Sequence, residues 1–184
     1  MKIGVLPIGK PDTTTIIWIK ENLAKAFPNA KCIAVDDKLS IRKENFDENR
    51  KQYNSHMILS EVQIYAATEI GLDRVLGVID ADIFIPELNF VFGEATCPGK
   101  AALISLWRLK PEFYDKPADT PLFLKRTVKE AVHELGHTLG LVHCPWSSCV
   151  MHFSNSISDT DMKRSSFCDS CTKSLLMHKA YMNL

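Results

Sequence analysis

The stretch VHELGHTLGLVHCPWSSCVM, residues 132–151, carries three histidines, two cysteines, a glutamate and a methionine. His133 and His137 are four residues apart, so on a helix they lie about one turn apart on nearly the same face. Two imidazole nitrogens placed in this way can bind one metal ion. Glu134 lies beside the first histidine without having to bind the ion, which suits a general base acting on a metal-bound water. The pattern predicts a helix that carries a catalytic type of zinc site.

A third zinc ligand is predicted just beyond the helix. A tetrahedral hydrolytic site needs three protein ligands and an open position. Gly140 permits a positive φ, so the chain can leave the helix sharply and bring His143 back to the metal. Met151 follows His143 by eight residues, and a methionine under a three-histidine zinc site is typical of metzincins. We expect Met151 to form an apolar floor for the imidazoles without binding the ion.

Four cysteines indicate a second metal site. Cys144 and Cys149 are separated by four residues, Cys168 and Cys171 are separated by two, and 18 residues lie between the pairs. This is close to the spacing of structural four-cysteine zinc sites. Region 141–167 has few large apolar side chains, so a closed thiolate site would hold its shape. The sequence therefore predicts two zinc ions per chain, one catalytic and one structural.

Two alternatives to the four-cysteine site stay open. Disulfides are disfavoured because nothing in the sequence indicates export to an oxidising compartment. His152 or His178 could also replace one of the cysteines as a ligand. The two predicted metal sites meet between the adjacent residues His143 and Cys144. Loss of the cysteine site is therefore expected to disturb the histidine site.

Length and composition fit one folded domain. The chain has 184 residues, of which 46% are hydrophobic and 24% are charged, enough for a single core. The 22 basic and 22 acidic residues cancel, so no global charge draws the protein to nucleic acid or to an anionic membrane. Short basic pairs such as Lys163-Arg164 are flanked by acids and predict solvated surface.

The sequence shows no targeting or membrane signal. The first ten residues, MKIGVLPIGK, are too short for the apolar region of a secretory signal. No stretch approaches the roughly 18 apolar residues of a membrane span. We therefore expect a cytoplasmic protein with a peptide substrate and with neither a nucleic-acid nor a membrane partner. We expect a monomer.

Hydrophobic periodicity predicts an α/β (α+β) fold with a mixed twisted sheet and packed helices. Together these elements form one metallopeptidase domain over residues 1–184. An N-terminal lobe (1–140) holds the sheet and the active-site helix at a cleft, and a small C-terminal lobe (141–184) holds the methionine turn and the cysteine site. The predicted strands are 2–8, 31–37, 74–84, 89–95 and 101–109, the predicted helices are 13–27, 55–70, 120–139 and a short one ending at 181, and the predicted loops are 38–50 and 141–167.

The motifs together resemble the archaemetzincins, a metzincin family. Its pattern H-E-x-x-H-x-x-G-x-x-H-C, then x4-C-x-M and a downstream C-x-x-C, is matched from His133 to Cys171 at every position. The resemblance implies a zinc-dependent peptidase with a cleft between an upper N-terminal lobe and a smaller C-terminal lobe. It also implies aminopeptidase-like action on small peptides. By analogy with metzincins, strand 89–95 is expected to pair with extended substrate.

The predicted reaction is peptide hydrolysis by zinc-activated water with Glu134 as the general base. Tyr114 or Tyr181 could supply a second oxyanion donor, and Glu94 or Glu130 could hold the substrate amine. The alternative interpretations are a zinc-organised binding module and a non-peptide zinc hydrolase, such as a ribonuclease, on a related fold. Glu134 and the zero net charge argue against a nuclease.

Overall fold

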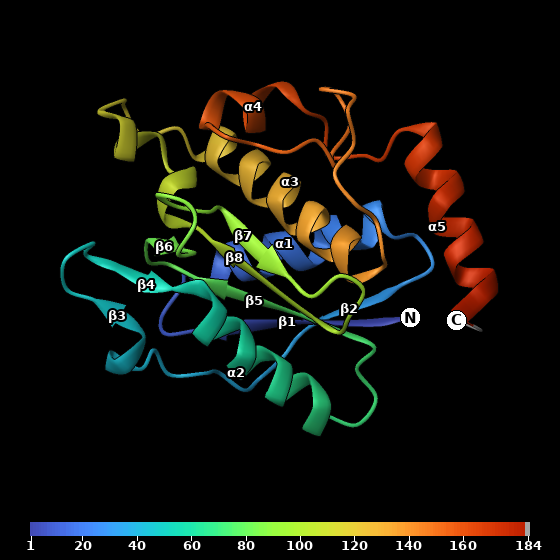
Figure 1. Ribbon diagram of the computed structural model, residues 1–184, viewed down its shortest axis with the longest axis horizontal. Helices are drawn as coiled ribbons and strands as arrows, with labels where there is room; N and C mark the ends of the chain where they lie inside the picture. Colours follow the sequence, from blue (N-terminus) through green and yellow to red (C-terminus); the bar gives the residue numbers. More distant parts are fainter. Residues whose placement is uncertain (183–184) are drawn as a thin grey trace.

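A five-stranded mixed sheet forms the centre of the protein (Figure 1). The structure is a computed structural model that describes the backbone of residues 1–182 and the side chains of residues 1–177. In spatial order the strands are β2 (Lys31–Ala34), β1 (Lys2–Ile8), β5 (Arg74–Ile79), β8 (Ala101–Ser105) and β7 (Gly93–Ala95). The first four strands are parallel, whereas β7 is antiparallel to β8 and forms one edge. The predicted mixed α/β fold is thus confirmed.

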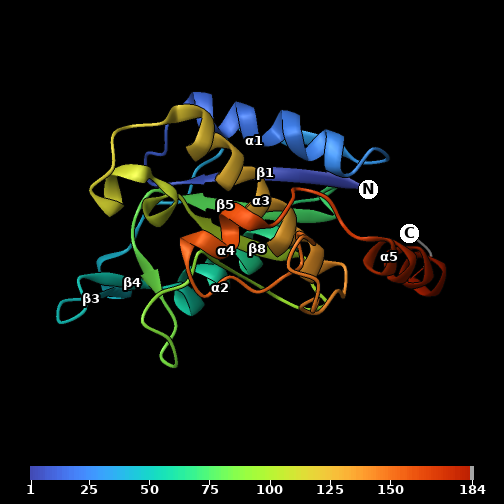
Figure 2. The same ribbon diagram turned by 90° about the horizontal axis from the view of Figure 1, so that it is seen from above.

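Helices cover both faces of this sheet (Figures 1 and 2). One face packs against α1 (Thr13–Ala26) and α3 (Thr120–Thr138), and the other packs against α2 (Ser55–Thr68). Neighbouring residues of one strand point to opposite faces. Leu76 therefore lies in the cluster with α1 and α3, and Val75 lies in the cluster with α2. Burial on both faces explains why the parallel strands are continuous apolar runs.

A side-chain cap begins α3 and a glycine turn ends it. Asp119 is the N-cap, because its carboxylate accepts a hydrogen bond from Leu122 N at 2.9 Å. Thr120 and Pro121 form the first turn. At the other end Gly140 has a φ of 88°, the left-handed conformation that the sequence predicted there. This turn directs the chain back towards the helix.

The predicted strand 74–84 is in fact two strands. It leaves the central sheet after Ile79, and β6 (Ile83–Phe84) pairs instead with β4 (Gln52–Asn54). Two polar residues cause the break, because Asp80 binds Lys110 Nζ at 2.7 Å and Asp82 binds the Arg108 guanidinium at 2.7 and 2.8 Å. β3 (Phe46–Asp47) completes this second sheet, so part of the predicted loop 38–50 is also a strand.

Three other predicted segments are shorter or more ordered than expected. Within 89–95 only Gly93–Ala95 is a strand, and 101–109 becomes a 3-10 helix at Trp107–Leu109. The predicted loop 141–167 contains α4 (Ile157–Met162). Its capping box joins Ser156 and Asp159, an S-x-x-D signal that was readable in the sequence.

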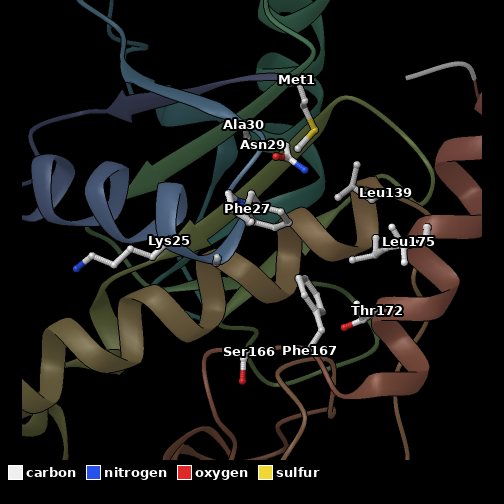
Figure 3. A pocket seen from close by; sticks show the side chains of 13 residues that line it. Met1, Lys25, Phe27, Asn29, Ala30, Leu139, Ser166, Phe167, Thr172 and Leu175 are labelled. Atoms are coloured by element: carbon white, nitrogen blue, oxygen red, sulfur yellow. The ribbon is translucent and has the colours of Figure 1, made fainter.

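The C-terminal segment packs against the end of α3 through apolar side chains. α5 (Asp169–Met182) lies at the edge of the molecule beside the start of β1 (Figures 1 and 2). The Phe167 ring meets the Phe27 ring edge-on with centroids 5.7 Å apart. Around this pair lies a cavity of about 420 Å³, lined also by Leu139 and Leu175 (Figure 3). No helix within the described residues is long and apolar enough to cross a membrane.

Candidate active site

The three predicted histidine ligands converge in one place. His133 and His137 project from α3, and the turn at Gly140 brings His143 to them. One ring nitrogen from each lies within 4.8 Å of the others, and the Nε2 atoms of His133 and His137 are 3.1 Å apart. Three imidazole nitrogens this close, with no carboxylate between them, fit the ligand set of a hydrolytic zinc ion.

Backbone carbonyl groups orient two of these imidazoles. The Nδ1–H group of His133 donates to Val150 O at 2.7 Å, and that of His137 donates to Leu141 O at 2.7 Å. This leaves Nε2 of each ring free to bind a metal. Burial lowers the pKa of His133 well below its usual value, which favours the neutral imidazole that metal binding requires.

Glu134 lies in the same cleft, against the edge strand β7. A Cβ atom at Gly93 would lie 2.6 Å from Glu134 Cγ and 2.7 Å from Oε1, so only glycine lets the strand approach this closely. Burial, followed by the nearby Glu130 carboxylate, raises the pKa of Glu134 well above its usual value. A bound divalent cation acts in the opposite direction and favours the ionised base.

We expect Gly93→Ala to lower kcat/KM by about a hundredfold, because the added methyl group must displace the Glu134 side chain by up to about 1 Å. The same atom would lie 2.6 Å from Leu103 O, so we also expect a stability loss of about 1–3 kcal/mol. Steady-state kinetics at saturating zinc, together with thermal unfolding, measure the two effects. Wild-type kinetics in this variant would mean that Glu134 is not positioned by β7.

Met151 is fully buried and lies beneath the turn of α3 between the two helical histidines. A Cβ atom at Gly136 would collide with Met151 Sδ and would lie 3.2 Å from Phe167 Cε1. The methionine therefore packs against the backbone of the metal-binding turn itself. This contact supports the predicted apolar floor, with the sulfur directed at the helix.

We expect Gly136→Ala to destabilise the zinc-loaded protein by about 1–3 kcal/mol through this overpacking. The measurement is the free energy of unfolding in urea. Combining the change with Met151→Ala, which removes the colliding sulfur, should give a loss smaller than the sum of the two single losses. Strict additivity would show that the two residues do not touch in solution.

The four cysteines predicted as a second site also come together. Their sulfur atoms all lie within 4.8 Å of one another, with Sγ–Sγ distances of 3.8 Å for Cys144–Cys168 and for Cys149–Cys171. They are free thiols and form no disulfide. The backbone N–H of Cys171 lowers the pKa of the Cys168 thiol to about 7, which favours a thiolate. This cluster fits a closed tetrahedral zinc site.

The sequence left His152 and His178 as alternative ligands for this second site. His152 lies outside the cluster, and its Nδ1–H donates to Cys144 O at 3.0 Å. The side chain of His178 lies outside the described residues, as does that of Tyr181. Tyr114 is not among the residues that line the cleft, and its hydroxyl donates to Arg108 O at 2.9 Å.

The cleft that holds the histidines has a volume of about 270 Å³. Its walls are β7 with the segment before it, one face of α3, and the chain around Phe153 and Ser154. Glu94 and Glu130 both line it, as predicted for an amine-binding acid. Both oxygens of Glu94 are engaged, however, one by Ser55 Oγ and the other by the His56 ring.

Sequence analysis missed the lysine beside this cleft. Lys163 was predicted as solvated surface, yet its side chain is fully buried and its Nζ lies 3.0 Å from Glu130 Oε1. The acidic residues that flank Lys163 in the sequence suggested a solvent-exposed side chain. Its partner Glu130 lies 33 positions earlier in the chain, and no sequence spacing indicates such a pair. Cys97 also lines the cleft, with its thiol donating to Leu141 O at 3.5 Å.

The chain is similar to proteins of one known family. Residues 15–177 match Peptidase family M54. The archaemetzincin of Methanocaldococcus jannaschii is 40% identical over 184 residues, which cover 100% of this chain and 98% of that protein. The crystal structure of archaemetzincin from Archaeoglobus fulgidus, complexed with malonate, has a TM-score of 0.79 at 38% identity, over 94% of this chain and 99% of that one.

A third similarity comes from a protein described by its activity. The zinc-dependent peptidase of Methanocorpusculum labreanum has a TM-score of 0.83 at 28% identity, again over 94% of this chain and 99% of that one. The family match spans most of the chain and includes the three histidines of the cleft and the four clustered cysteines. The chain therefore belongs to the archaemetzincins, peptidase family M54, and is a zinc metallopeptidase.

Proposed function

We propose that this metallopeptidase hydrolyses short peptides with aminopeptidase-like preference, using Glu134 as the general base and His133, His137 and His143 as ligands of the catalytic zinc. The observation that carries the proposal is the convergence of three histidine nitrogens within 4.8 Å in the cleft that Glu134 lines. The family assignment supports the reaction class, and the geometry supports the roles of these residues.

Each residue has a distinct part in the proposed reaction. When bound by the three histidines, zinc supplies a Lewis acid that activates water and polarises the peptide carbonyl group. Glu134 accepts the proton of the attacking water and then delivers it to the leaving amine nitrogen. The carbonyls of Val150 and Leu141 keep the imidazoles oriented throughout.

The edge strand β7 gives extended substrate a place to bind. Among the residues that the structure describes it pairs only with β8, so one side of its backbone is unpaired within the central sheet. Glu134 lies against Gly93 of this strand. A peptide added as a further strand would therefore run past the general base, which supports recognition by β-augmentation over residues 93–95.

We also propose that a second, structural zinc is held by Cys144, Cys149, Cys168 and Cys171, which gives two ions per chain. Residues 141–184 then form a small C-terminal lobe stapled by this ion, below an N-terminal lobe of residues 1–140. The sulfur cluster supports the staple, because all four of these cysteines lie within residues 141–184.

The test is mass spectrometry of a diverse peptide mixture incubated with the zinc-loaded protein, beside a matched Glu134→Ala sample. We expect new products only in the wild-type sample, shortened from the N-terminus by one or a few residues. Products cut at internal positions would replace the aminopeptidase-like proposal with an endopeptidase. Identical, uncut mixtures would favour the zinc-organised binding module.

A further inference from the structure

A buried glutamate with one unengaged oxygen lies in the cleft, one helical turn before the general base. Glu130 is 2% exposed, and its Oε1 accepts a hydrogen bond from Thr160 Oγ1 at 2.9 Å and pairs with Lys163 Nζ at 3.0 Å. Within residues 1–177 no hydrogen bond reaches Oε2, and that oxygen is not among the fully buried atoms left without a partner. Since Glu130 lines the cleft, Oε2 is available to a bound molecule.

Three carboxylates are among the side chains that line the cleft. Glu94, Glu130 and Glu134 line it, and within residues 1–177 no lysine or arginine does. Glu134 is assigned to proton transfer, and both oxygens of Glu94 are already engaged by Ser55 and His56. Glu130 is therefore the carboxylate that remains for recognition of the substrate.

Lys163 holds one oxygen of Glu130, and the other oxygen has no partner within the described residues. α3 and α4 are joined independently of it, because the Arg126 guanidinium binds both oxygens of Asp161 at 2.7 Å and Lys129 Nζ donates to Asp161 O at 2.8 Å. A buried ion pair recovers only part of the cost of desolvating its charges, so stability alone is a weak reason for the Lys163–Glu130 pair. Its position at the cleft points to a role in binding.

Aromatic rings also line the same cleft. Phe90 and Phe153 add aromatic surface to the lining. A cationic nitrogen on an aliphatic stem matches the carboxylate and the rings, because the open Glu130 oxygen accepts its hydrogens while the rings pack on the stem and attract the charge.

We propose that Glu130 is a specificity residue that binds a cationic nitrogen of the peptide substrate. Two sources supply this chemistry: the α-ammonium group at the N-terminus and the side chain of a lysine or arginine near the scissile bond. The first would make the protein an aminopeptidase and the second a peptidase for basic residues. The inference rests on the proposed peptidase function, and it assigns the charge preference of that cleft to one side chain.

The experiment measures peptide binding by calorimetry to the full-length, zinc-loaded protein in a Glu134→Ala background, where substrates stay uncut. One matched pair is a peptide with a free or an acetylated N-terminus. The other is an acetylated peptide with lysine or norleucine at successive positions. We expect the cationic member of one pair to bind about tenfold to a hundredfold more tightly, the range for a charged hydrogen bond. The peptide pair that shows this difference in affinity identifies the source of the nitrogen.

Variants then assign the preference to Glu130. In Glu130→Gln/Lys163→Met both charges disappear together, so no lone buried charge remains, and the affinity ratio should fall to about one. Glu130→Gln alone is the second variant, since its amide oxygen still accepts from Thr160. Asp161→Asn, which alters the same helix contact outside the cleft, should keep the wild-type ratio.

Three results would overturn the inference: no discrimination in either pair, a ratio that survives both Glu130 variants, or a ratio lost equally in Asp161→Asn. The calorimetric experiment measures binding without turnover. An uncut peptide mixture in the mass-spectrometric test therefore refutes the proposed activity and does not affect the measured charge preference of binding. Conversely, active protein with no charge preference refutes only the role of Glu130.

Discussion

Replacing Glu134 by glutamine is expected to lower kcat/KM for peptide hydrolysis by about a hundredfold to ten-thousandfold, the usual contribution of a positioned general base. Glutamine keeps the size of the side chain against Gly93, so the packing of β7 is retained. It cannot accept the proton of the attacking water, so the loss belongs to the chemical step. Steady-state kinetics with the peptides found by mass spectrometry give the ratio, and zinc content by elemental analysis should match that of the wild type.

A matched control is Glu112→Gln, the same chemical change at an exposed position in the 3-10 helix Pro111–Tyr114. It should retain wild-type kinetics, because Glu112 does not line the cleft. A Glu134→Gln protein with normal zinc content and undiminished hydrolysis would show that another group takes the proton. Glu94 would then be the first residue to test, because it lines the same cleft.

Cys168→Ser removes one thiolate from the second site, and we expect two losses. The structural zinc should no longer be retained, with a marked fall in thermal stability, because binding of such an ion contributes about 10–16 kcal/mol to folding of small zinc domains. The affinity of the catalytic zinc should also fall by about tenfold to a hundredfold, the usual effect of disturbing groups that orient metal ligands.

The expected fall in catalytic-zinc affinity follows because the ligands of the two sites lie on the same stretch of backbone. Cys144 directly follows His143, and its N–H donates to Met151 O at 2.9 Å. Val150, next to Cys149, accepts the hydrogen bond of His133 Nδ1–H at 2.7 Å. The cysteine cluster thus holds the third histidine, the methionine floor and the carbonyl that orients the first histidine.

Competition with a chromophoric chelator measures both zinc affinities, and Cys32→Ser is the matched control. Cys32 lies in β2 outside the sulfur cluster, so this variant should keep both ions. Unchanged catalytic-zinc affinity in Cys168→Ser would show that the two sites are independent, in spite of their adjacent ligands.

The parts of the site that could be predicted from sequence are those encoded by local spacing. His133 and His137 are fixed by helical periodicity, and Gly140 marks the turn that returns His143, so their convergence needed no knowledge of the fold. The cysteine pairs were similarly readable from their spacing. In these cases the chemistry restricts the residue type and the local backbone restricts the geometry.

The parts that could not be predicted depend on contacts between distant segments. Lys163 is charged and has acidic neighbours in the sequence, and only the folding of α4 onto α3 places it beside Glu130. The break after Ile79 likewise depends on Lys110 and Arg108, which bind the aspartates from another part of the chain. Local hydrophobicity alone indicated one continuous strand there.

The open edge at β7 also bears on self-association. An unpaired strand edge is a template for other copies of the same chain, and proteins limit this hazard by keeping such edges short or charged. β7 has three residues with Glu94 at its centre, and β2 at the opposite edge has four residues and begins with the exposed Lys31. Neither edge offers a long, flat apolar strand, so the protein can leave a backbone edge exposed at its cleft with little tendency to aggregate.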